Sequence, residues 1–158
     1  MNTPSPARPW VVKWMYGVAA VHLAVGVLLA WIANVDALNF YHLRIEEAFW
    51  GGIAPAAARA QQVWWISLFG ATVQSMSLWM WALVRIGNKQ RVAAAWGWLI
   101  AGIVLWAPQD MWISMQVQVW LHVVVDLVAL LVMLPPLVWL YRHDKRIAVS
   151  SEIQRVQA

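Results

Sequence analysis

The chain contains no cysteine and few charged residues. Of its 158 residues, 11% are charged and 63% are hydrophobic, whereas a soluble domain has about 25% charged and about 45 to 50% apolar residues. The absence of cysteine excludes a disulfide framework, thiolate catalysis, and zinc, iron–sulfur or c-type haem sites held by cysteine. Because so few charged residues cannot cover a water-soluble fold, the composition indicates a membrane protein.

Four apolar stretches are long enough to be read as membrane spans. They cover residues 10–33, 63–84, 92–107 and 117–141. The third is the shortest, and we expect Pro108 either to end it or to kink its last turn. The predicted fold is an all-α, four-helix membrane bundle in a single domain over residues 1–158, with a loop over 34–62 and a tail over 142–158.

The distribution of basic residues predicts the orientation of this bundle. Nine lie on the side of the termini: Arg8, Lys13, Arg85, Lys89, Arg91, Arg142, Lys145, Arg146 and Arg155. Only Arg44 and Arg59 lie on the other side, here called the outer side. Since Lys and Arg are retained in the cytoplasm, both termini are predicted to be cytoplasmic, in a multi-pass protein of a bacterial inner membrane.

The net charge of +4 does not indicate nucleic-acid binding. The basic residues flank apolar segments and form no patch with interleaved aromatic residues, so membrane orientation explains them and we predict no nucleic-acid partner.

The chain is tryptophan-rich, with 14 Trp residues. Seven lie near the predicted cytoplasmic ends: Trp10, Trp14, Trp79, Trp81, Trp96, Trp98 and Trp139. Seven lie near the outer ends: Trp31, Trp50, Trp64, Trp65, Trp106, Trp112 and Trp120. Indole rings favour the headgroup level of a bilayer, so two belts are preferred over the alternative of a ligand cage.

A cleaved signal peptide is the alternative to the first span, because Val35 and Ala37 resemble a cleavage site after an apolar run. We prefer a retained span. The run is longer than a usual signal sequence and contains His22 and Trp31, and its retention keeps the distribution of basic residues consistent.

The outer loop contains an amphipathic segment from Asp36 to Gly51, predicted as a short helix. Its apolar residues at helical spacing are Leu38, Tyr41, Ile45 and Phe49. Adjacent Glu46 and Glu47 diverge by about 100° on a helix, so they form no acid/base pair and are expected to be solvated. The helix either lies flat in the membrane interface, which we prefer, or covers the outer mouth of the bundle.

Polar residues recur every four positions toward the fourth span: Asp110, Ser114, Gln118, His122 and Asp126. On one helix they describe a slow spiral, with Asp126 about 15 Å deep. A membrane Asp costs about 2.5 to 3.5 kcal/mol, so such residues usually face the bundle interior.

His22 and Gln74 lie at a similar predicted depth, on helix faces with small residues that allow close packing. The predicted site is a buried cluster that binds a small polar ligand or a proton. Its residues are His22, Gln74, Gln118, His122 and Asp126. The alternative is that this cluster only fixes helix register.

Several classes of function stay open. The chain is either a subunit that packs against a membrane partner or its own copies, or a carrier that uses the predicted cluster. A quinone or haem protein is a third alternative, although His22 and His122 differ in depth by roughly 8 to 9 Å, which disfavours shared haem ligation. An intramembrane enzyme is the fourth, and no catalytic motif supports it. The sequence does not identify a cofactor, and no metal site is predicted.

Overall fold

The protein is all-helical in the computed structural model, which describes residues 6–156, with side chains to residue 154. The helices are α1 (Ala7–Ile32), α2 (Asn39–Trp50), α3 (Ala56–Gln90), α4 (Ala93–Gln116) and α5 (Trp120–Val156), and a short 3-10 turn, Asp36–Leu38, precedes α2. No strand occurs in this part of the chain, so the all-α prediction is confirmed for it. The end of the predicted tail, 157–158, lies outside the described residues.

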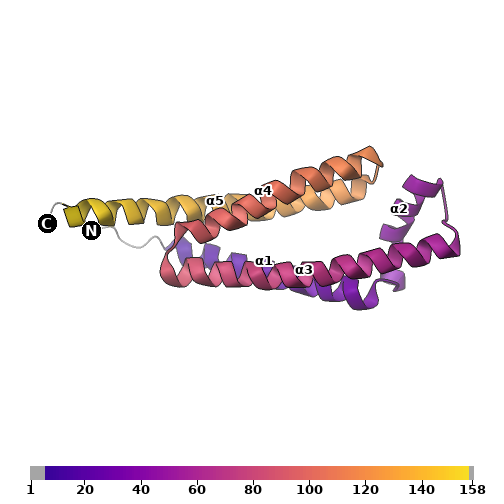
Figure 1. Ribbon diagram of the computed structural model, residues 1–158, viewed down its shortest axis with the longest axis horizontal. Helices are drawn as coiled ribbons and strands as arrows, with labels where there is room; N and C mark the ends of the chain where they lie inside the picture. The colour runs from indigo at the N-terminus through magenta and orange to yellow at the C-terminus, as the bar shows by residue number, and fades with distance from the viewer. Residues whose placement is uncertain (1–5, 157–158) are drawn as a thin grey trace.

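The four long helices form two antiparallel pairs (Figure 1). Helix α1 lies beside α3, and α4 lies beside α5. The pairs meet at the end where α1 begins and α3 turns into α4, and they diverge toward the end that carries α2 (Figure 1). We call these the joined end and the open end.

Glycines allow the close approach of α1 and α3. A Cβ atom on Gly70 would lie 2.4 Å from the backbone nitrogen of Ala30, and one on Gly26 would lie 2.8 Å from that of Gln74. The Gln74 side-chain amide also donates a hydrogen bond of 3.2 Å to the Gly26 carbonyl. Small residues at such positions are typical of tightly packed membrane helices.

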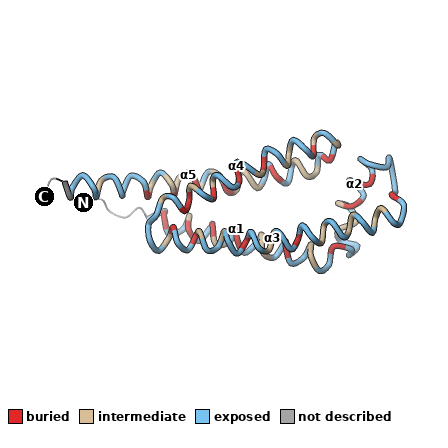
Figure 2. The backbone as a smooth tube through the Cα atoms, viewed as in Figure 1, coloured by how far each residue is buried: buried red, intermediate tan, exposed pale blue. Residues whose placement is uncertain are grey.

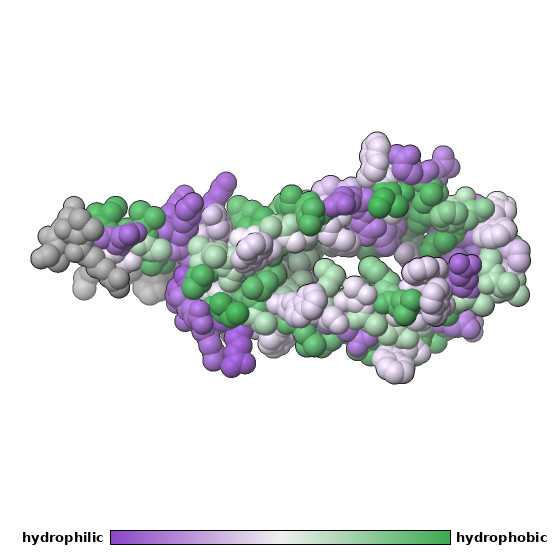
Figure 3. Space-filling view, in the orientation of Figure 1, coloured by the Kyte–Doolittle hydropathy of each residue, from purple (hydrophilic) through white to green (hydrophobic). Residues whose placement is uncertain are grey.

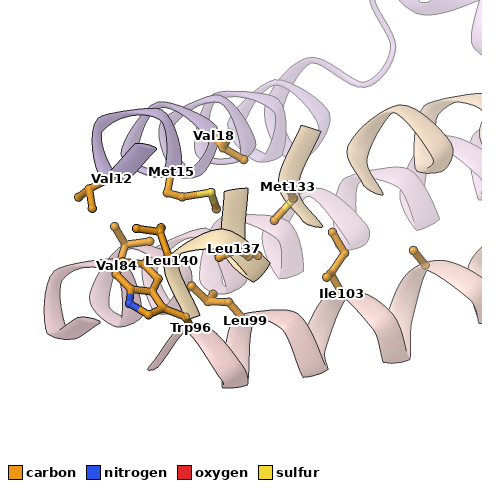
Figure 4. Packing of buried hydrophobic residues seen from close by; sticks show 11 residues of the cluster. Val12, Met15, Val18, Val84, Trp96, Leu99, Ile103, Met133, Leu137 and Leu140 are labelled. Atoms are coloured by element: carbon orange, nitrogen blue, oxygen red, sulfur yellow. The ribbon is translucent and has the colours of Figure 1, made fainter. Parts of the chain in front are cut away.

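The buried apolar core lies toward the joined end and draws on all four long helices (Figure 4). Met15 of α1, Val84 of α3, Trp96 of α4, and Leu137 and Leu140 of α5 are fully buried there. The core therefore holds the two pairs together where they meet.

Burial is confined to the inner faces of the helices (Figure 2). Large apolar side chains are exposed on all five helices, and many are visible on the surface in Figure 3. Two helical stretches, Ala7–Ile32 and Trp120–Gln154, are long and apolar enough to cross a membrane, which suggests a membrane location.

The structure corrects the predicted polar spiral. Helix α4 continues past Pro108 to Gln116, so Asp110 and Ser114 belong to α4 and not to the helix of His122 and Asp126. Gln118 interrupts the series with a left-handed backbone, φ 59°. The spacing of four thus spans a helical hairpin, in which residues on either side of the turn face each other.

We expect Gly70→Ala to destabilise the protein, because the added Cβ meets the backbone of α1. Overpacking of this kind costs about 1 to 3 kcal/mol. Gly17→Ala is the matched control, since a Cβ there meets nothing within 4 Å and alanine favours the helix by about 1 kcal/mol. Unfolding of the two variants in detergent measures the difference. An unchanged or raised stability for Gly70→Ala would show that the helices do not pack this closely.

Candidate functional site

Helix α2 is held at the open end by a buried ion pair. Glu46 is 1% exposed and accepts hydrogen bonds from the guanidinium of Arg59 at the start of α3 and from the Ala54 backbone N–H, the latter 3.1 Å long. The hydrogen bond from Arg59 lowers the pKa of the Glu46 carboxyl, against the opposite effect of burial. The expectation that Glu46 is solvated is therefore wrong, because Arg59, 13 residues away, supplies its partner. Glu47 is exposed, as predicted.

His42 provides a second anchor for α2. Its ring is fully buried; Nε2–H donates to the Ala33 carbonyl at 2.7 Å, and Nδ1 accepts from the Gln62 amide at 2.8 Å. These contacts tie α2 to the end of α1 and to α3, so the inner face of α2 is polar. They leave Tyr41, the neighbour of His42, to reach across to α5.

Four polar side chains from three helices meet where Tyr41 reaches α5. We call Tyr41 of α2, Asp110 of α4, and His122 and Asp126 of α5 the Asp126 cluster. The Tyr41 hydroxyl lies 2.8 Å from His122 Nδ1, and His122 Nε2–H donates to Asp110 at 3.2 Å. The second carboxylate, that of Asp126, has its Oδ2 atom 4.0 Å from the same Nε2. With His122 neutral, the hydroxyl donates to Nδ1, so a hydrogen-bonded chain runs from Tyr41 through His122 to Asp110.

Asp126 is the least satisfied member of the cluster. Its side chain is 1% exposed, and its Oδ2 atom has no hydrogen-bond partner among the described residues. Buried acceptors in native proteins almost always have a partner, which is often a water or an ion where no protein group serves. This oxygen is therefore a candidate position for a hydrogen-bond donor or a cation.

Tyr41 carries a strongly perturbed hydroxyl. Burial, together with the negative charges of Asp110 and Asp126, raises its pKa to about 12. The phenol is protonated at neutral pH, so it can donate a hydrogen bond to His122 Nδ1, or accept one from it when the ring proton is on Nδ1.

The structure brings together only two of the residues predicted for the site, His122 and Asp126. Gln118 is exposed in the turn between α4 and α5. His22 donates through Nδ1 to the Val18 carbonyl of its own helix at 2.8 Å, and Gln74 bonds to Gly26. Across the residues whose side chains are described, no hydrogen bond or ion pair joins His22 or Gln74 to Asp126, and their role in binding stays a prediction.

Sequence reasoning did not place Tyr41 and Asp110 in the site. The sequence pattern places Tyr41 on the apolar stripe of the outer helix. It places Asp110 nearer the outer surface than the predicted cluster. The spacing of 12 residues between Asp110 and His122 is the signal that could have paired them, once a turn between the two was recognised.

No protein-family model, curated protein or solved structure matches this chain. Its candidate site is therefore defined by geometry and chemistry.

A second polar cluster lies at the joined end, and the buried polar side-chain atoms of its Arg8 and Asp144 all have hydrogen-bond partners. The Arg8 cluster comprises Arg8, Gly87, Asn88, Trp96 and Asp144. Arg8 pairs with both Asp144 oxygens at 2.8 Å, and donates further to the Asn88 side chain at 3.0 Å and the Gly87 carbonyl at 3.2 Å. The indole N–H of Trp96 donates to Asp144 at 2.9 Å. Since Trp96 is fully buried, it is not part of a lipid-facing belt.

The two clusters differ in what they leave unsatisfied. Arg8 and Asp144 have side chains 5% and 0% exposed, opposite charges and a full set of partners, as a structural ion pair requires. Asp126 is equally buried but keeps a free acceptor beside a second carboxylate. The Asp126 cluster is thus the candidate functional site.

We expect Asp144→Asn to be strongly destabilising, because it leaves the buried Arg8 without a charged partner. Breaking a buried ion pair costs about 3 to 5 kcal/mol. Glu47→Gln is the control: it removes the ion pair with Arg44, in which both side chains are about two-thirds exposed, and such pairs are worth about 0 to 1 kcal/mol. Unfolding in mixed micelles compares the two. Similar losses in both variants would contradict a structural role for the Arg8 cluster.

Proposed function

We propose that this chain is a four-span membrane protein that binds a small, positively charged polar ligand at the Asp126 cluster. The observation that carries the proposal is the buried, unpartnered Oδ2 atom of Asp126. Asp110 and His122 lie beside it, so two carboxylates and one imidazole converge on one point. A buried carboxylate needs a compensating charge or hydrogen bonds, and a cationic ligand supplies both.

The way the helices pair supports four spans. Helix α1 and the apolar stretch of α5 are each suited to a bilayer, and α3 and α4 lie alongside them. A membrane crossed by α1 is therefore also crossed by α3, and the same holds for α5 and α4. The 24 residues of α4 extend for about 36 Å, against a hydrocarbon core of about 30 Å.

The charges of the two ends support a cytoplasmic joined end. Basic residues gather at the start of α1, around the turn between α3 and α4, and in the second half of α5: Arg8, Lys13, Arg85, Lys89, Arg91, Arg142, Lys145 and Arg146. By the positive-inside rule this end faces the cytoplasm. The open end with the Asp126 cluster then faces away from it, so the ligand enters from the outer side of the membrane.

A purely structural role fits the Asp126 cluster less well. Polar groups that only fix helix register need mutual hydrogen bonds, and the Arg8 cluster provides such a set. The Asp126 cluster instead combines an unpartnered oxygen with side chains of His122 and Asp110 that are 21% and 24% exposed. Partial exposure beside a buried acceptor gives a ligand both an entry and a binding partner.

Native mass spectrometry of the mildly solubilised protein tests the binding proposal. We expect the wild-type chain to carry an additional bound mass that Asp126→Asn loses, because the neutral amide no longer attracts a cation. Glu47→Gln, an exposed carboxylate at the same end, serves as the matched control and should keep the bound mass. A wild-type chain without bound mass, or an equal mass on Asp126→Asn, contradicts the proposal.

Cysteine labelling tests the four-span topology, and the natural chain gives no background because it has no cysteine. In a bacterial inner membrane, Glu47→Cys is expected to react with a membrane-impermeant maleimide applied to intact cells. Lys89→Cys, in the last turn of α3 at the joined end, is expected to react only after the membrane is permeabilised. Labelling of both or neither in intact cells would show that the two ends do not lie on opposite sides.

A further inference from the structure

Three side chains of the Asp126 cluster present ligand atoms in the arrangement of a metal site. Asp110, His122 and Asp126 each offer one donor atom, and these atoms lie within 4.8 Å of one another. Metal–ligand bonds of about 2.0 to 2.2 Å in a tetrahedral site place neighbouring donors roughly 3.3 to 3.6 Å apart. The separations from His122 Nε2, 3.2 Å to Asp110 and 4.0 Å to Asp126, lie on either side of that value.

The charges at the site also match a divalent ion. Asp110 and Asp126 supply two negative charges that a neutral imidazole does not offset. An ion of charge +2 balances them and provides a partner for the free Oδ2 atom of Asp126. In a site this buried, charge balance of this kind decides whether both carboxylates can stay ionised.

Tyr41 stands in the position that orients a metal-binding histidine. Such a histidine usually donates its second ring N–H to a neighbouring acceptor, which fixes the ring and its tautomer. With the His122 proton on Nδ1, the ring donates to the Tyr41 hydroxyl oxygen 2.8 Å away. The Nε2 lone pair then points toward the two carboxylates. Ion binding therefore requires that the ring proton move from Nε2 to Nδ1 and that the Tyr41 hydroxyl turn its own proton away from the ring.

We infer that Asp110, His122 and Asp126 bind a divalent first-row transition-metal ion, with Tyr41 as the positioning residue for His122. The inference rests on the proposed function, because it names the ligand class of the same cluster. The imidazole donor favours zinc over calcium and magnesium, which take oxygen ligands, and the two carboxylate donors also suit manganese. Three protein ligands leave a coordination position for water on the partly exposed side of His122 and Asp110.

Metal titration of the purified full-length protein tests the inference. After chelation and desalting in detergent, Zn²⁺ binding is measured by elemental analysis and calorimetry, and Mn²⁺ binding by the loss of the free-ion paramagnetic signal. We expect one ion per chain and an affinity reduced by more than about 100-fold in Asp126→Asn and Asp110→Asn. Tyr41→Phe keeps all three donors and should lose about 10-fold, as expected for a group that orients a ligand.

Two controls separate the site from surface binding and from misfolding. Glu47→Gln, which removes an exposed carboxylate at the same end, should bind both ions as the wild type does. Circular dichroism and size-exclusion profiles identify any misfolded variant. If Asp126→Asn is misfolded, its loss of metal binding is uninformative, and Tyr41→Phe decides the inference. Unchanged affinity in a correctly folded Asp126→Asn would overturn the inference. If Asp126→Asn misfolds, unchanged affinity in Tyr41→Phe would overturn it.

The outcome also distinguishes this inference from the proposed function. If the wild type carries an organic cation that Asp126→Asn loses, and binds neither Zn²⁺ nor Mn²⁺, the metal inference is wrong and the proposed function stands. If the wild type carries no bound mass and binds neither ion, both are wrong. Tight binding of either ion that depends on Asp126 and on Tyr41 supports both.

Discussion

The ion pair between Arg8 and Asp144 determines how the long helices meet. The two residues are 136 positions apart and join the first turn of α1 to α5, while Asn88 and Trp96 bring α3 and α4 to the same pair. Removing two charges from water costs several kcal/mol per ion unless geometry and hydrogen bonds repay it. The pair and its hydrogen-bond partners therefore connect all four long helices at one place.

The open end is a consequence of this concentration of contacts at the joined end. The buried core and the Arg8 cluster lie together, and the two helix pairs diverge away from them (Figure 1). Helix α2 is held at that open end by its polar inner face, through Glu46 and His42. Since α2 is fixed to α1 and α3, its Tyr41 links one helix pair to His122 of the other. The Asp126 cluster is therefore assembled from both halves of the chain.

Local patterns predicted what depends on local structure. The outer helix ends at Gly51, as predicted, because a left-handed residue with φ 67° suits glycine. Asp126 was identified as buried because a carboxylate in an apolar run must face the interior. The hydrogen-bond partners of Glu46 and Asp110 were missed, because Arg59 and His122 lie beyond a turn in each case. The turn at Gln118 contains no glycine, proline or asparagine, so a spacing of four continued through it without a visible break.

The two buried clusters differ in how their buried charges are compensated. Arg8 and Asp144 form a neutral, fully hydrogen-bonded pair, which adds rigidity and needs nothing further. At the open end, Asp110 and Asp126 share a single imidazole, and within the described side chains neither carboxylate forms an ion pair with Lys or Arg. A buried carboxylate without a partner is costly, and either a proton or a cation can compensate its charge. In the proposed function, the same fold therefore uses charge for assembly at one end and for ligand binding at the other.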